Sequence, residues 1–246
     1  MKNKPFTFTP KKHAFTLAEV LITLGIIGIV AALTLPALIQ KNNNRVVETR
    51  LMKFYSAINQ AVKMAEVDYG DKKFWYQDLK GAELDKDGNP VAGSSESEKW
   101  FKKYLAPYLK ITSIETKTDG SFIIYFPDGS ALKPSGKNTR DWTFYPGKPD
   151  KCIKQYGLAY NASNGICSFS FEFYPADGTS QGWKYHYNKG FEPWKWNWDG
   201  TRVALLKGCK GGGSHDEGSA DKQFCTALIQ FNNWKIPDDY PFKVSY

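Results

Sequence analysis

Glu19 raises the first chemical question, because it is the only charged side chain between Phe15 and Ile39. A carboxylate in a membrane helix costs roughly 3 kcal/mol or more, so such a residue usually has a partner and a function. If the chain is cut between Ala14 and Phe15, a new amino terminus appears four residues before the acid. The ammonium group of one copy can then pair with Glu19 of a neighbouring copy in lipid, where each charge alone is unfavourable.

The element that carries this acid is the apolar run 15–39. As a helix it would span about 37 Å, against a hydrocarbon core of ~30 Å. Two lysines precede it and keep that end in the cytoplasm. Three interpretations compete: a secretory signal peptide cleaved near Ala37, an uncleaved anchor, and a segment cut before Phe15 that keeps the helix. A signal peptide destined for destruction gains nothing from Glu19, so the acid favours the third.

Residues 11–39, KKHAFTLAEVLITLGIIGIVAALTLPALI, resemble the N-terminal cleavage and methylation segment of type IV prepilins and type II secretion pseudopilins. The resemblance implies that a prepilin peptidase cuts between Ala14 and Phe15 and that a methylase modifies Phe15. It assigns filament assembly to Glu19, at the fifth mature position, and a helix kink to Pro36, at the twenty-second. One departure bears on processing efficiency: the family usually has Gly before the cut, where this sequence has Ala14.

After Gln40 the chain turns polar but keeps a helical period. The apolar stripe consists of Val47, Leu51, Phe54 or Tyr55, Ile58, Val62 and Ala65. The sequence Asp68-Tyr69-Gly70 is a signal for the end of the helix. The pattern predicts one helix from Phe15 to about Val67, with a second half that packs under a globular head.

The rest of the chain reads as short strands between turns, with strands over 121–126 and 168–174 and a short helix over 98–110 that is interrupted at Pro107. The predicted fold class is α+β, and the resemblance adds a pilin-like plan, a long N-terminal helical spine against an antiparallel sheet. The predicted regions are a leader that is removed (1–14), a transmembrane and assembly helix (15–39), its amphipathic continuation (40–67) and an α+β head (68–246).

Four cysteines, Cys152, Cys167, Cys209 and Cys225, lie in the C-terminal half. An even number in a chain with an export-like start predicts two disulfides. Three pairings are possible, and the sequential one closes two short loops, each worth roughly 3 kcal/mol. No C-x-x-C pair supplies zinc-ligand spacing, so no metal site is expected. The tail from Cys209 is similar to the ends of some prepilin-like proteins, in which a strand follows a cysteine-closed loop.

The stretch 182–200, GWKYHYNKGFEPWKWNWDG, is the most aromatic part of the head. Alternating aromatic residues on two strand-like runs predict a hairpin with an aromatic face. These residues are Trp183, Tyr185 and Tyr187 on the first run, and Trp194, Trp196 and Trp198 on the second. Such a face would bind sugar, single-stranded nucleic acid or a partner subunit. The alternative, favoured because aromatic residues dominate cores, is a face buried against the spine or against the loop above it.

Composition argues against several other functions. The net charge of +8 owes four positive charges to lysines of the leader, and without them 29 basic residues face 25 acidic ones, so no nucleic-acid partner is expected. No nucleophile-and-base set stands out, so we expect neither an enzyme nor a cofactor.

The expected partners are membrane lipid before assembly, related pilin or pseudopilin subunits, and the processing enzymes. The expected location is a bacterial inner membrane, with the head periplasmic or extracellular. An exported or anchored sugar- or DNA-binding protein, including a DNA-uptake pseudopilin, is the alternative.

Overall fold

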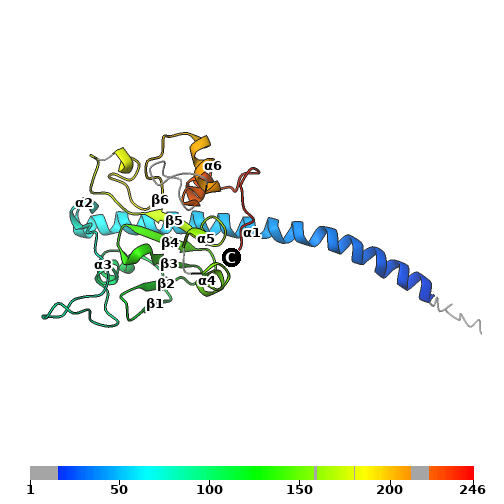
Figure 1. The fold of residues 1–246 in the computed structure, drawn as a ribbon, viewed down its shortest axis with the longest axis horizontal. Helices are drawn as coiled ribbons and strands as arrows, with labels where there is room; N and C mark the ends of the chain where they lie inside the picture. The colour runs from blue at the N-terminus through cyan, green and yellow to red at the C-terminus, as the bar shows by residue number, and fades with distance from the viewer. Residues whose placement is uncertain (1–15, 158–159, 180, 212–221) are drawn as a thin grey trace, which may run out of the picture. The chain divides into compact units, whose positions relative to one another are not determined.

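A computed structural model of the chain describes residues 16–157, 160–179, 181–211 and 222–246. The fold is α+β, with one long helix and a sheet, as predicted, and with more short helices than the one that was expected (Figure 1). The helices are α1 (Leu17–Tyr69), α2 (Lys72–Trp75), α3 (Glu96–Tyr104), α4 (Pro149–Tyr156), α5 (Tyr160–Ser163), α6 (Arg202–Lys210) and α7 (Cys225–Phe231), with 3₁₀ helices η1 (Ala106–Tyr108), η2 (Ser135–Lys137) and η3 (Gln181–Trp183). The strands are β1 (Ser113–Thr116), β2 (Phe122–Tyr125), β3 (Ala131–Pro134), β4 (Asp141–Tyr145), β5 (Phe169–Glu172) and β6 (Glu192–Pro193).

The chain divides into two compact units, Met1–Lys41 and Asn42–Tyr246. In the first unit, the described residues are the apolar start of α1, which is long and apolar enough to cross a membrane. Pro36 lies inside α1 without ending it. The hydroxyl of Thr23 donates to the carbonyl of Glu19 (2.9 Å), and that of Thr34 to the carbonyl of Val30 (2.8 Å). These hydroxyls are therefore satisfied by their own helix, which lipid requires.

The second unit is built on a six-stranded sheet in which every strand pairs with the next one along the chain (Figure 1). All five pairings are antiparallel. In the β4–β5 pairing Trp142 lies opposite Phe171 and Asp141 lies opposite Glu172. Strands β2 and β5 fall within the predicted ranges, and α3 followed by η1 replaces the single interrupted helix expected over 98–110.

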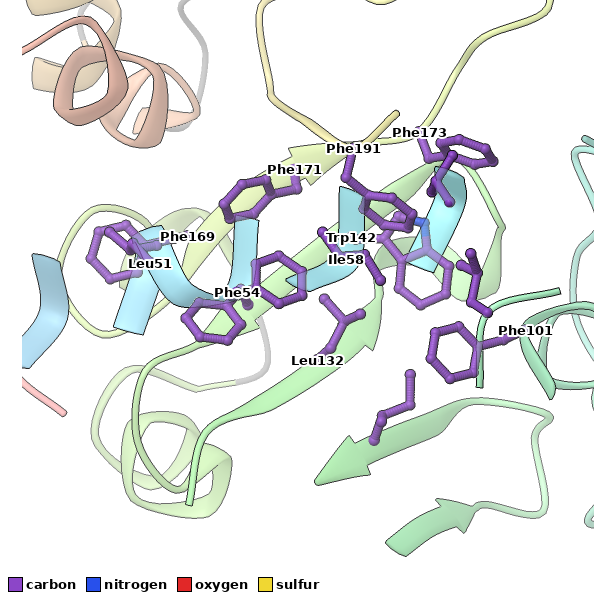
Figure 2. Packing of buried hydrophobic residues seen from close by; sticks show 14 of the residues in the cluster. Leu51, Phe54, Ile58, Phe101, Leu132, Trp142, Phe169, Phe171, Phe173 and Phe191 are labelled. Atoms are coloured by element: carbon purple, nitrogen blue, oxygen red, sulfur yellow. The ribbon is translucent and has the colours of Figure 1, made fainter. Parts of the chain in front are cut away.

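The main core lies between α1 and one face of the sheet. The predicted stripe is buried, with Phe54 rather than Tyr55 as its aromatic member, and Ala61 joins it; the buried residues are Val47, Leu51, Phe54, Ile58, Ala61, Val62 and Ala65. The ring of Phe54 stacks on Phe144 of β4 at 4.4 Å and meets Phe171 of β5 edge-on at 5.0 Å. Figure 2 shows the α1 side chains among the aromatic side chains of the strands. The amphipathic half of the spine thus holds the sheet by aromatic packing, which is worth more than its buried area alone.

The opposite face of the sheet has a smaller cluster, formed by Ile123, Ala131 and Tyr145 with Cys152 and Cys167. These two cysteines form one disulfide, and Cys209 and Cys225 form the other. The predicted number of disulfides is correct, and the pairing is the sequential one. A third cluster joins α6, α7 and Trp194 around the second disulfide.

The strand expected after Cys225 is wrong, because that segment is helix α7. Five consecutive residues at the start of this helix, from Cys225 to Ile229, are buried. A short run that is buried on all sides has no periodicity that separates a helix from a strand. Beyond it, Asn233 and Trp234 have φ values of 54° and 61°, which stop an extended strand at that point.

Candidate functional site

Glu19 closes the first turn of its own helix. Its Oε2 accepts hydrogen bonds from the backbone nitrogen and the hydroxyl of Thr16, both at 2.8 Å, and its own nitrogen donates to the Thr16 hydroxyl at 3.3 Å. This reciprocal arrangement is a capping box, which satisfies backbone donors that a helix start leaves free. Ala14 and Phe15, the predicted cleavage and methylation residues, lie outside the described residues.

The capping box was missed by the sequence reasoning, although its signal is present. Thr16 and Glu19 have the S/T-x-x-E spacing directly before an apolar run. The sequence interpretation of Glu19 covers only its negative charge and the positive group that would pair with it. In the structure the same carboxylate also has a local partner, so the loss of its charge and the loss of its cap are separable effects.

The apolar start of α1 leaves its side chains uncovered. Between Leu17 and Ile39 thirteen large apolar side chains are exposed. Burying one such side chain gains roughly 1.5–3 kcal/mol, so covering the whole set is worth tens of kcal/mol. An exposed apolar surface of this size is typical of a segment that contacts a membrane or other apolar helices.

The predicted aromatic hairpin over 182–200 is wrong. The first run forms η3 and turns, and in the second run only Glu192 and Pro193 form a strand, β6, which pairs with β5. Asn188 and Asn197 have φ values of 56° and 58°, and each breaks the extended alternation that a hairpin needs. The alternation of aromatic residues in the sequence therefore does not produce one aromatic face.

The six aromatic residues of this tract go to different places. Trp194 is buried in the cluster of α6 and α7, and Tyr185 packs against Trp198 at 4.8 Å. Tyr187 is exposed. Trp183 and Trp196 are half-buried, with ring centroids 6.3 Å apart. The tract thus provides core residues and, in three cases, the walls of a pocket.

This pocket has a volume of about 330 Å³ and lies over β4 and β5. Its aromatic walls include Trp183, Trp194 and Trp196, and its polar groups include Arg140, Asp141, Glu172 and Gln223. Small-molecule sites are typically of this size or larger, and they combine apolar walls with a few polar groups. The sequence reasoning found the aromatic walls but not the polar groups, because β4 brings Asp141 from a segment that carried no motif.

Glu172 is fully buried beside His186, which is also fully buried. Oε2 of Glu172 lies 2.9 Å from Nε2 of His186, and this nitrogen also accepts the backbone N–H of Lys195 at 3.1 Å. Burial, and then the nearby Asp141, raise the pKa of Glu172 well above its usual value. Burial lowers the pKa of His186 to about 3. Both shifts favour the neutral forms, a protonated Glu172 and an uncharged His186.

Two acceptor groups at this pocket have no hydrogen bond within the described part of the chain. They are Oε1 of Glu172, the carboxyl oxygen that does not face His186, and Oε1 of Gln223. A buried acceptor left unpaired costs about 1–3 kcal/mol. In contrast, Arg140 donates to both carboxylate oxygens of Asp141, at 3.0 and 2.8 Å, and its guanidinium lies 5.1 Å from the ring centroid of Trp183.

A second polar group connects the spine to the edge of the sheet. The hydroxyl of Tyr55 donates to Oε1 of Glu192 (2.8 Å), and the ammonium of Lys195 lies 3.3 Å from the other oxygen. Lys195 also donates to Gln230 of α7 (2.5 Å). Burial lowers the pKa of Lys195, and Glu192 opposes this effect. Through Glu192, these contacts position β6, which leads into Trp194 and Trp196, relative to α1.

Comparison with known proteins gives two matches that together cover most of the chain. Residues 9–35 match the prokaryotic N-terminal methylation motif, which identifies a prepilin-type segment of a type IV pilin-like subunit. Residues 37–244 match a family described as a family of unknown function (DUF6613). No curated protein and no solved structure gives a match.

Proposed function

We propose that this chain, which belongs to the family DUF6613, is cut between Ala14 and Phe15, methylated on Phe15 and polymerised through its N-terminal helix into a pilus or pseudopilus. It then works as a structural subunit and performs no chemistry. Segment 15–39 waits in the inner membrane with its N-terminus cytoplasmic, and later exchanges lipid for neighbouring helices. Segment 40–67 continues the spine, and 68–246 forms the periplasmic or extracellular head.

The observation that carries this proposal is the methylation motif on a helix with thirteen exposed large apolar side chains and one carboxylate. A soluble head needs no such helix, and a simple anchor needs no acid in it. The two disulfides support delivery of the head to an oxidising compartment.

Processing is tested by mass spectrometry of the N-terminal peptide from membranes of the native cells. We expect a mature chain that begins with N-methylated Phe15. Deletion of the prepilin peptidase gene should leave the leader attached. A chain that begins near Leu38 instead would support ordinary secretion, and with it an exported binding protein.

The role of Glu19 is tested with variants that separate its charge from its cap. Glu19→Gln keeps a capping-box side chain but removes the charge, whereas Thr16→Ala removes the two hydroxyl contacts of the cap but keeps the charge. If the carboxylate pairs with the amino terminus of a neighbour, Glu19→Gln is processed and membrane-bound but absent from sheared filaments. Thr16→Ala is incorporated. Normal amounts of Glu19→Gln subunit in the filaments would refute the pairing.

A pilus and a pseudopilus are separated by where the polymer is found. Immunogold labelling of the head, with the native gene cluster expressed at its normal level, should show surface fibres for a pilus. For a pseudopilus, label confined to the periplasm and loss of secreted proteins on deletion of the gene are expected.

A further inference from the structure

The pocket over β4 and β5 has the features of a ligand-binding site, and the proposed function gives it no role. All its lining residues belong to the second unit, after residue 41. It contains buried polar groups without hydrogen bonds, aromatic walls and a guanidinium with a fixed position. Each of these features restricts the chemistry of what fits there.

The unpaired groups are hydrogen-bond acceptors, so a ligand that fits them donates hydrogen bonds. Nε2 of His186 accepts from Lys195, so Glu172 can approach it at 2.9 Å only as the protonated acid. Its other oxygen is then an acceptor, as is Oε1 of Gln223, and neither makes a hydrogen bond of normal geometry among the described residues, although the side chains of Trp194 and Asp141 both act on Glu172. Hydroxyl or amide groups of a ligand would complete both.

Charge in the pocket argues against an ionic ligand. Arg140 and Asp141 neutralise each other through two hydrogen bonds, and the buried acid beside them is neutral. A phosphate would therefore find no unpaired positive charge among the described lining residues. The guanidinium of Arg140 already covers the ring of Trp183, so a cationic ligand would meet a like charge where it would otherwise stack.

The walls select for a ligand with an apolar side. Trp196 is half-buried, and its ring lies 6.2 Å from that of Trp194 and 6.3 Å from that of Trp183. A pyranose ring has a face of C–H groups that packs on an indole, and hydroxyls around its edge that donate and accept.

We propose that this pocket binds a neutral saccharide unit, which stacks on Trp196 and donates hydroxyl hydrogen bonds to Glu172 and Gln223. The inference does not rest on how the subunit is processed or assembled. A head with this site gives its filament, or whatever structure carries it, an affinity for neutral glycans.

The test uses the full chain in an amine-oxide detergent, since maltoside and glucoside detergents are themselves sugars. The probes are an immobilised array of neutral oligosaccharides built from glucose, galactose, mannose and N-acetylglucosamine, followed by titration of tryptophan fluorescence with the best binder. Trp196→Ala removes the stacking wall and Gln223→Leu removes an acceptor. Trp198→Ala is the matched control, because it lies two residues away but packs against Tyr185 outside the pocket.

We expect binding by the wild type, about tenfold or greater weakening in Trp196→Ala and Gln223→Leu, and unchanged binding in Trp198→Ala. All variants should keep two disulfides and a cooperative unfolding transition. If Trp196→Ala does not fold, Gln223→Leu decides. The proposal is overturned if no neutral oligosaccharide binds, if putrescine binds in its place, or if Trp198→Ala weakens binding as much as Trp196→Ala.

Discussion

Glu172 and His186 form a buried acid–imidazole pair, and the opposite pKa shifts of the two groups predict how pH acts on stability. The folded pKa of His186 is about 3, below its ordinary 6.5, so its contribution to stability is lost as the pH falls below 6.5. The folded pKa of Glu172 lies well above its ordinary 4.5, so its contribution is lost as the pH rises above 4.5. Between these two ordinary values the effects oppose each other.

We therefore predict a nearly flat stability for the wild type between pH 4.5 and 6.5, as far as this pair is concerned. Glu172→Gln removes the opposing effect, so the free energy of unfolding should fall on acidification, by at most about 1.4 kcal/mol per pH unit. His186→Gln should instead lose stability as the pH rises. Urea unfolding at several pH values measures these slopes. Equal slopes in the wild type and both variants would contradict the assignment of the proton.

Residue types alone revealed part of the candidate site. Glu19 and the tryptophans were visible as unusual residues in their surroundings. The capping partner of Glu19 was visible too, but the spacing to Thr16 was not considered. Glu172 could not be recognised, because its burial and its cross-strand neighbour Asp141 depend on the register of β4 and β5.

On the scale of elements, the contact between α1 and the sheet dominates the core. We predict that Phe54→Ala lowers the free energy of unfolding by about 3–5 kcal/mol, because its ring is enclosed by Phe144 and Phe171. Met52→Ala, on the exposed side of the same helix, is the control and should change stability by about 0.5 kcal/mol or less. Similar losses in both variants, measured by denaturant unfolding, would show that helix propensity rather than packing is being measured.

The two disulfides close loops of nearly equal length, with sequence separations of 15 and 16 residues. We predict that replacing either pair by alanine costs roughly 3 kcal/mol. The two losses should add when both pairs are replaced, because the disulfides belong to different clusters and share no packing partner there. Denaturant unfolding of the two double variants and the quadruple variant measures this, and a strongly non-additive result would indicate a single shared core.

Elements were predictable from the sequence where one periodicity extends over many residues. The spine helix and its stripe agree with the structure from Val47 to Ala65, about five turns, because each turn repeats the same information. The prediction of a hairpin over 182–200 failed because two asparagines with positive φ interrupt a short alternating pattern. The prediction of a strand where α7 lies failed because burial on all sides removes the periodicity that identifies a helix.

For the whole molecule, the second unit contains all the residues of the buried core clusters and both disulfides. We predict that residues 42–246, exported to an oxidising compartment, fold into a soluble monomer, whereas the full chain requires lipid or detergent. Size-exclusion chromatography and thermal unfolding check this. Aggregation of the shortened chain with its disulfides formed would show that α1 before residue 42 contributes to the stability of the head.

The order of the strands has a consequence for biogenesis. Each strand of the sheet pairs with the one that immediately precedes it, so no strand waits for a distant partner. A chain that crosses a membrane with its N-terminal helix held in the bilayer delivers α1 first, and then the strands one by one. If the head is exported in this order, each new strand docks on an edge that is already in place, and the residues after α7, which bring Val244 into the main core, dock last.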